Sequence, residues 1–171
     1  MAFRSERQLD DLDWAILAEL QADARLSYNE LGRRVHLSSP ATAERVRRLE
    51  EAGVITGYRA QVDPTRAGHP VSAFVQMRCA QERCLLKTSS EDDYPEVVEV
   101  QKLSGDHCAM LKVRTTSVGH LEGLLERLGT HGAMRTSIVL SSQYEARPVA
   151  PPPDDVPVAT PSRGWPRPGA R

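Results

Sequence analysis

The feature of this sequence that most restricts its fold is a pair of helical stretches separated by only three residues. Ser27-Tyr28-Asn29-Glu30 has the form of a capping box, in which a serine caps a helix and a glutamate reaches back to the cap amide. This helix is predicted to run to about Val35, before the turn His36-Leu37-Ser38. Ser38 or Ser39 caps the next helix, which Gly53 stops. So short a connection between two helices is typical of a helix-turn-helix.

An earlier helix and a later hairpin complete the first part of the chain. The segment 54–62 alternates around Gly57, which predicts two short strands joined by a turn. Three helices followed by such a hairpin predict a winged helix-turn-helix over residues 1–62. The first helix is expected from about Asp10 to Ala22, with an apolar stripe at spacings of three and four formed by Leu9, Leu12, Ile16 and Leu20.

Charge is distributed unevenly between these helices, although the chain of 171 residues has a net charge of only −1. From Glu6 to Asp23, one basic residue stands against six acidic ones, whereas from Arg33 to Arg48 five arginines stand against one glutamate. The first helix therefore repels phosphate and the third attracts it. A helix-turn-helix seats its last helix in the major groove, where the first residues of that helix meet base edges and nearby arginines hold phosphates. The third helix is therefore predicted to bind double-stranded DNA.

The predicted DNA contacts lie on the side of the third helix that points away from Val46, the reference for its buried side. In the alternative interpretation, the arginines only solvate an exposed face and pair with Glu44, Glu50 and Glu51. The helix spacing and the hairpin favour DNA binding over that alternative. The predicted DNA-binding residues are Arg34, Ser38, Ser39, Pro40, Ala41, Glu44, Arg45, Arg47 and Arg48.

Clusters of proline and glycine divide the rest of the chain. Asp63-Pro64 and Gly68-His69-Pro70 predict a linker over residues 63–70. Eight of the twelve prolines lie in the last 24 residues, where aliphatic side chains are scarce. Because such a stretch cannot bury a core, residues 148–171 are predicted to form a disordered tail. Residues 71–147 are left as a second folded domain.

The second domain shows strands and helices in the order βαββαβ. Strands are predicted over Val71–Cys79, 95–103, 107–114 and 135–144, with helices over 81–93 and Val118–Leu128. This order is the ferredoxin-like arrangement, one antiparallel sheet with two helices on one face. The fold class is therefore predicted to be α+β. The bare face of the sheet needs a cover, most simply a second copy of the same domain.

Four runs of residues in the first domain form one long pattern. They are Leu9-Asp10-x-x-Asp13-x-x-Ile16-Leu17, Glu30-Leu31-x-x-Arg34-Val35-x-Leu37-Ser38, Glu44-Arg45-Val46-Arg47-Arg48-Leu49-Glu50 and Gly53-Val54-Ile55-x-Gly57-Tyr58. With these runs, the domain closely resembles the DNA-binding half of the Lrp/AsnC family, the feast/famine transcriptional regulators.

The second domain is similar to the regulatory RAM domain of the same family. The similarity lies in Pro95-Glu96-Val97, Ser104-Gly105-Asp106, Leu111-Lys112-Val113 and the run from Arg135 to Leu140. The resemblance implies a sequence-specific transcriptional regulator. It also implies a homodimer paired through RAM sheets, often built into higher oligomers, and an amino acid or related small molecule that binds between dimers.

One loop departs from the family pattern. Family members commonly carry G-D-x-D between the second and third RAM strands, and the second aspartate is linked to the effector response. Here the loop is Gly105-Asp106-His107-Cys108, and a neutral thiol cannot pair with a cation. The turn amides still suit a carboxylate, and Asp106 can accept from an ammonium group. The predicted effector-binding residues are Ser104, Gly105, Asp106, Cys108, Thr136, Ser137 and Ile138.

The cysteines leave other functions to weigh. Three cysteines without a CxxC pair predict reduced thiols, with Cys79 and Cys84 as packing residues. Catalysis by His107 and Cys108 is disfavoured because neighbours on a strand point to opposite faces, so no catalytic residue or cofactor is predicted. An effector-independent architectural DNA-binding protein is one alternative. A metal- or redox-responsive regulator is another, although the candidate ligands lack recognisable spacing and no metal site is predicted; they are Cys79, Cys84, His107, Cys108 and His120.

Membrane insertion and export are not expected. No run approaches eighteen apolar residues, and the first thirteen residues carry charges where a secretory signal needs an apolar stretch. The sequence therefore predicts a cytoplasmic protein with no membrane partner.

Overall fold

A computed structural model describes residues 9–80, 82–153 and 155, and it divides the chain into two compact units. Among the described residues, one unit consists of residues 9–59 together with 146–153 and 155, and the other lies within residues 60–145. The first unit is therefore built from two separate stretches of the chain. Most of the predicted disordered tail, residues 154 and 156–171, lies outside the described residues.

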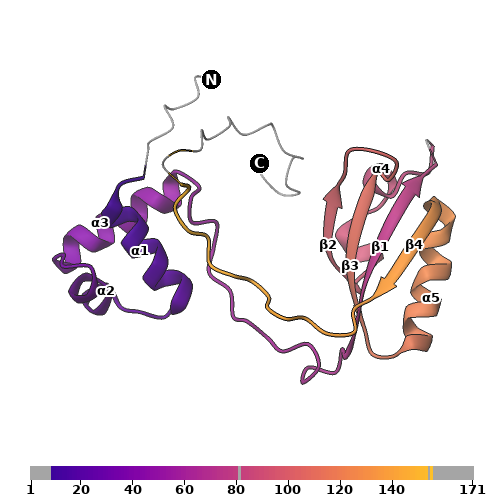
Figure 1. Cartoon of the computed structure of the whole chain (residues 1–171), viewed down its shortest axis with the longest axis horizontal. Coiled ribbons are helices and arrows are strands. Elements are labelled where there is room, and N and C mark those ends of the chain that lie inside the picture. Colours follow the sequence, from indigo (N-terminus) through magenta and orange to yellow (C-terminus); the bar gives the residue numbers. More distant parts are fainter. Residues whose placement is uncertain (1–8, 81, 154, 156–171) are drawn as a thin grey trace. The chain divides into compact units, whose positions relative to one another are not determined.

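Three helices form the first unit: α1 (Asp11–Ala22), α2 (Tyr28–Arg34) and α3 (Ser39–Glu51) (Figure 1). Each has a side chain at its N-cap, because the first backbone amides of a helix have no partner within the helix. Ser38 caps α3, as one of the two predicted choices. Ser27 caps α2, but the Glu30 carboxylate bonds to Arg33 and Arg34, so the predicted capping box is only half formed.

The turn between α2 and α3 depends on one left-handed residue and on one close approach by a glycine of α2. His36 has a φ of 58°, in the left-handed region. Gly32 lies against the turn so closely that a Cβ atom there would come within 2.6 Å of the Leu37 carbonyl oxygen and 2.9 Å of Thr42 Oγ1. The core beneath the turn is apolar and holds the three helices together; its fully or almost fully buried residues are Ile16, Leu31, Val35, Val46 and Leu49.

The predicted wing is wrong in this chain. No residue between Val54 and Val62 forms a strand. The segment is instead hydrogen-bonded to α3. The backbone amides of Val54 and Ile55 donate to the Leu49 carbonyl, and the Tyr58 hydroxyl donates to Glu50 at 2.8 Å. Alternation of side chains favours strand geometry, but a two-stranded hairpin without further sheet to pair with is only marginally stable.

The second unit confirms the predicted βαββαβ order (Figure 1). Its antiparallel sheet has the strand order β2-β3-β1-β4. The elements are β1 (Val71–Cys79), α4 (Leu85–Thr88), β2 (Val97–Lys102), β3 (Ala109–Thr115), α5 (Val118–Leu128) and β4 (Gly132–Ile138), with short 3-10 turns at Glu91–Asp93 and Gly129–His131.

Two element lengths differ from the prediction. The helix expected over 81–93 contracts to the single turn α4, because its one apolar patch offers the core little more than Leu85. The last strand begins at Gly132 and ends at Ile138, where its pairing with β1 ends. The Val139 amide still donates to the Ser72 carbonyl at 2.9 Å, but residues 139–144 form no strand.

The two faces of the sheet differ in chemistry. One face packs on α4 and α5 to form the core, with Ala73, Val75 and Met77 from β1 and Leu111 and Val113 from β3 fully buried. On the other face, β1 and β3 present two apolar residues, Phe74 and Met110. Their neighbours there are polar: Ser72, Gln76, Arg78, Lys112 and Arg114.

Candidate functional site

The N-terminus of α3 is an exposed edge of the helix-turn-helix. Ser38, Pro40 and Ala41 are exposed, and Ser39 is partly exposed. Thr42 and Val46, one and two turns further along, are fully buried and anchor the helix from the opposite side. A rigid helix whose first turn projects from a packed core is the geometry with which helix-turn-helix proteins reach base edges.

Arg47 and Arg48 are half-exposed on α3 and pair with glutamates of the same helix. Arg47 lies 2.8 Å and Arg48 2.7 Å from Glu44, and Arg47 also contacts Glu51. Hydrogen bonds from Arg47 and Arg48 hold the pKa of Glu44 below its ordinary value, so Glu44 is ionised near neutrality. Exposed pairs of this kind contribute about 0 to 1 kcal/mol each and do not prevent contact with phosphate.

Arg45 has a different environment from the other two arginines. Its guanidinium lies 2.8 Å from Asp10 and 2.7 Å from Asp13, at the start of α1. Asp13 is buried, with 5% of its side chain exposed, and 23% of the Arg45 side chain is exposed. Hydrogen bonds to Asp10 and Asp13 raise the pKa of Arg45. Arg45, predicted as a DNA contact, therefore joins α3 to α1 inside the domain.

Arg34 also bonds within the domain. It lies 2.8 Å from Glu19 of α1 and 3.2 Å from Glu30 of its own helix. The sequence interpretation missed these links between helices because the partners of Arg34 and Arg45 on α1 lie 15 to 35 residues away along the chain. The opposite charges of the acidic first helix and the basic third helix were the sequence signal that could have indicated these ion pairs.

The two halves of the predicted effector site lie apart within one chain. Ser104, Gly105 and Asp106 form an exposed turn beside the end of β1, where the Arg78 guanidinium donates to the Asp106 carbonyl at 3.4 Å. Gly105 has a φ of 106°, which favours glycine. The other half, Thr136 to Ile138, pairs with Val75 to Ala73, toward the start of β1. At about 3.3 Å per residue along a strand, several residues separate the two halves.

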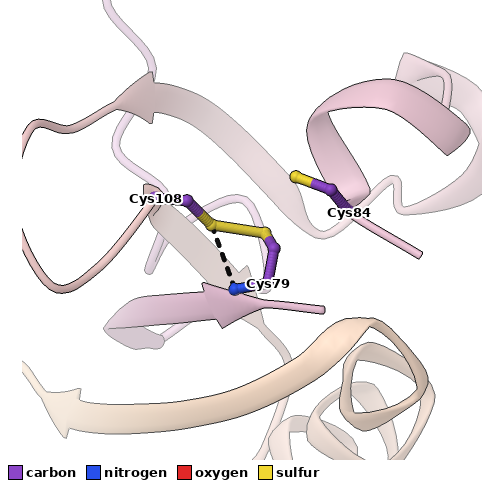
Figure 2. A group of neighbouring side chains, drawn as sticks. All are labelled: Cys79, Cys84 and Cys108. Atoms are coloured by element: carbon purple, nitrogen blue, oxygen red, sulfur yellow. Dashed lines mark hydrogen bonds between the residues drawn. A yellow bond between two sulfur atoms is a disulfide. The ribbon is translucent and has the colours of Figure 1, made fainter. Parts of the chain in front are cut away.

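The cysteines differ from the sequence prediction. Cys79 and Cys108 form a disulfide across 29 residues, and Cys84 is a free, buried thiol beside them (Figure 2). The expectation of a reduced, buried thiol is confirmed for Cys84 and wrong for Cys79 and Cys108 in this structure, and the Cys108 sulfur is not a free group in the effector loop. The cause is the sheet, which brings the end of β1 beside the start of β3.

A polar network around α5 was not predicted from the sequence. Glu96 accepts from His120 at 2.9 Å and contacts Arg127. Burial raises the pKa of Glu96, but backbone hydrogen bonding, His120 and Arg127 together lower it below its ordinary value. A shallow cavity of about 470 Å³ lies nearby and includes Tyr94, whose hydroxyl is 2.7 Å from His131 Nε2.

Within the described part of the chain, no helix is long and apolar enough to cross a membrane. The fold and its exposed α3 define a class of protein, a helix-turn-helix DNA-binding protein with a second, ferredoxin-like domain. Known protein families match both domains of the chain. Residues 9–50 match the AsnC-type helix-turn-helix domain, and residues 72–149 match the Lrp/AsnC ligand binding domain.

Individual relatives give the same result. The chain is 40% identical over 134 residues to the uncharacterized HTH-type transcriptional regulator YezC of Bacillus subtilis, covering 78% of this chain and 95% of that protein. The structure of Bacillus subtilis LrpC is similar with a TM-score of 0.76 at 32% identity, covering 81% of this chain and 99% of LrpC.

A third relative was solved with a ligand. It is the feast or famine regulatory protein of Mycobacterium tuberculosis complexed with L-methionine, with a TM-score of 0.73 at 35% identity, covering 84% of this chain and all of that one. The chain belongs to the Lrp/AsnC family. It is a DNA-binding transcriptional regulator, and the family is one of regulators rather than enzymes.

Proposed function

We propose that this regulator reads duplex DNA with the N-terminus of α3, acts as a homodimer or larger oligomer in the cytoplasm, and responds to an amino acid. The observation that carries the DNA proposal is the exposed first turn of α3 above a buried anchor. Ser38, Ser39, Pro40 and Ala41 contact base edges in this proposal, and Arg47 and Arg48 contact phosphates. Glu44 orients those two arginines, and Arg34 and Arg45 hold the helices in place.

The proposed oligomer rests on the face of the sheet that carries no helix. Phe74 lies at the centre of that face on the inner strand β1, and 38% of it is exposed. The separation of the two effector halves within one chain also favours an assembly, because a site built from both halves then takes one half from each of two copies. Twofold symmetry requires a pseudopalindromic operator with half-sites about 10 base pairs apart or a multiple of that spacing.

Light scattering tests the oligomer directly. We expect the wild-type chain to be a dimer or larger at micromolar concentration, and Phe74→Glu to shift it toward the monomer because an ionised carboxylate resists burial. Val118→Glu is a matched control, because Val118 is exposed on α5, away from the sheet face in question. A monomeric wild type would contradict the proposal, as would dissociation caused equally by both variants.

The proposed effector is a free amino acid, of which L-methionine is the first to try because a relative of known structure is complexed with it. Asp106 and the amides of the exposed turn offer partners for the ammonium and carboxylate groups. The Cys79–Cys108 disulfide removes the sulfur from this role, so the turn rather than the cysteine carries recognition. The architectural alternative, a DNA-binding protein without an effector, predicts no response to any amino acid.

A thermal-shift screen of the twenty amino acids separates these two cases. We expect at least one amino acid to stabilise the chain, by about 2.7 kcal/mol at a ligand concentration 100 times its Kd. Asp106→Ala should remove that shift. Asp92→Ala, which removes another exposed carboxylate from the same unit, should leave it unchanged. A response gained only by Cys108→Asp would mean that the natural chain does not sense amino acids, and a strong response unaffected by Asp106→Ala would place the site elsewhere.

A further inference from the structure

Three cysteines from separate parts of the second unit meet at one end of its sheet. Cys79 ends β1, Cys108 immediately precedes β3, and Cys84 occupies the N-cap position of α4 (Figure 2). The three sulfur atoms all lie within 4.8 Å of one another. Cys79 and Cys108 are bonded, with 6.2 Å between their Cα atoms, and Cys84 remains a thiol.

The backbone places these residues independently of the disulfide. The Cys108 amide donates to the Met77 carbonyl at 2.8 Å, and the Leu103 amide donates to the Cys108 carbonyl at 2.9 Å. On the other side of β1, Cys79 pairs with Gly132 of β4. The Cys84 carbonyl accepts from the Lys87 amide at 2.8 Å and the Thr88 amide at 3.1 Å. Reduction of the disulfide therefore leaves three thiols held close together.

Backbone polar groups and apolar side chains surround the cluster. The backbone amide of Cys79 points at the Cys108 sulfur from 3.2 Å (Figure 2). The same sulfur lies 3.3 Å from the Met77 carbonyl oxygen, so one backbone donor and one backbone acceptor contact it. Cys84 is only 8% exposed, and Cys79 and Cys108 are partly buried against the apolar core. Water therefore competes weakly for a species bound among the sulfurs.

We propose that reduced Cys79, Cys84 and Cys108 form a three-thiolate site for a thiophilic divalent metal ion, with Zn²⁺ as the representative ion. Thiolates select zinc and other soft ions over magnesium or calcium. A tetrahedral ion with bonds of about 2.3 Å to sulfur holds its sulfur ligands about 3.8 Å apart, which the present cluster reaches through small side-chain rotations. Three protein ligands leave a fourth position for water, as in open zinc sites.

Oxidation state decides whether the site exists. A dithiol reductant delivers two electrons and two protons to the Cys79–Cys108 disulfide, which yields two thiols and converts the reductant to its own disulfide. Binding of a divalent ion then forms three metal–sulfur bonds and releases the three thiol protons, which leaves a metal–thiolate group of net charge −1. The disulfide and the metal exclude each other, because they use the same two sulfur atoms.

The cluster lies at the base of the loop between β2 and β3. Cys108 follows Asp106 by two residues, and Asp106 accepts from Arg78, the neighbour of Cys79. The metal and the disulfide both tie this loop to the end of β1 through sulfur, while the reduced, metal-free form leaves it tied by the Cys108–Met77 backbone hydrogen bond and by Arg78. Any effect of the metal ion on amino-acid binding at this loop rests on the proposed function. Metal binding itself does not depend on that function.

The test is a zinc titration of the full-length chain, with neither DNA nor amino acid present, so its result is independent of the proposed function. The protein is reduced with a phosphine, desalted without oxygen, and titrated with Zn²⁺ against a chromophoric chelator. We expect one Zn²⁺ per chain bound at submicromolar Kd, and Co²⁺ in its place should show sulfur-to-metal charge-transfer absorption. Protein carrying the Cys79–Cys108 disulfide should bind at least about 100-fold more weakly.

Cys84→Ser is the decisive variant, because it retains the pair that forms the disulfide and removes only the third sulfur. We expect it to lose zinc affinity by about 100-fold or more while circular dichroism shows an unchanged fold. His107→Asn removes the imidazole beside Cys108 without touching the cluster and should bind zinc as the wild type does. The proposal is overturned if the reduced wild type binds no zinc at micromolar concentration, if Cys84→Ser binds as tightly as the wild type, or if His107→Asn loses the ion.

Discussion

Replacing Arg47 and Arg48 together with alanine should weaken binding of the intact protein to every duplex sequence. Each arginine that contacts phosphate releases condensed counterions, so the slope of log K against log salt should become shallower by about two for each bound subunit of the double variant, or about four for a dimer. The loss should be uniform across sequences, because phosphates carry no base identity. Fluorescence anisotropy with a specific and an unrelated duplex, repeated over a range of salt concentrations, measures both quantities.

The ion pairs within α3 affect how much DNA affinity is lost in the double variant. The helix carries three arginines and three glutamates, and hydrogen bonds from Arg47 and Arg48 hold the pKa of Glu44 below its ordinary value. DNA therefore competes with Glu44 for these two arginines, and Glu44→Gln should strengthen nonspecific binding. Arg66→Ala is the matched control, because Arg66 is a highly exposed arginine outside α3. Unchanged salt slopes for the Arg47 and Arg48 variants would contradict the docking of α3 on DNA.

Replacing Arg45 with alanine should instead destabilise the first unit, by about 2 to 3 kcal/mol. The variant leaves Asp13 with its charge buried and without its guanidinium partner, and it removes the link between α3 and the start of α1. Urea unfolding followed by circular dichroism at a helical wavelength measures the loss. Arg47→Ala, which removes an arginine held only by exposed carboxylates, should change the free energy of unfolding by less than about 1 kcal/mol.

A double-mutant cycle assigns the effect to the pair itself. Asp13→Asn and Arg45→Ala should be coupled, so the double variant loses less stability than the sum of the two single losses. DNA binding by folded Arg45→Ala should keep the wild-type salt slope. A stable Arg45→Ala with a shallower slope would return Arg45 to the phosphate contacts that the sequence predicted.

The parts of the fold that depend on neighbouring residues could be predicted from the sequence. Ser27 and Ser38 cap helices where their hydroxyls reach amides three residues away, and the apolar residues of α3 recur at the helical period. The alternation in Val71–Cys79 predicted β1 to the residue. These signals are local, because they arise from backbone geometry that repeats every two to four residues. The wing failed for the same reason: residues 54–62 alternate, but alternation supplies no strand for them to pair with.

The candidate site depends on both kinds of information. The exposed first turn of α3 follows from its helical period, so the sequence by itself determined which residues face outward as candidates for DNA contact. Only the tertiary structure decided what they touch: Arg45 meets Asp10 and Asp13 across 35 and 32 residues, and Cys79 meets Cys108 across 29. Such contacts depend on how helices and strands pack. The sequence around a charged residue or a cysteine does not show which distant residue it will contact. The division of this protein into helices, strands and exposed faces is therefore local in origin, whereas its ion pairs and its sulfur cluster are products of packing.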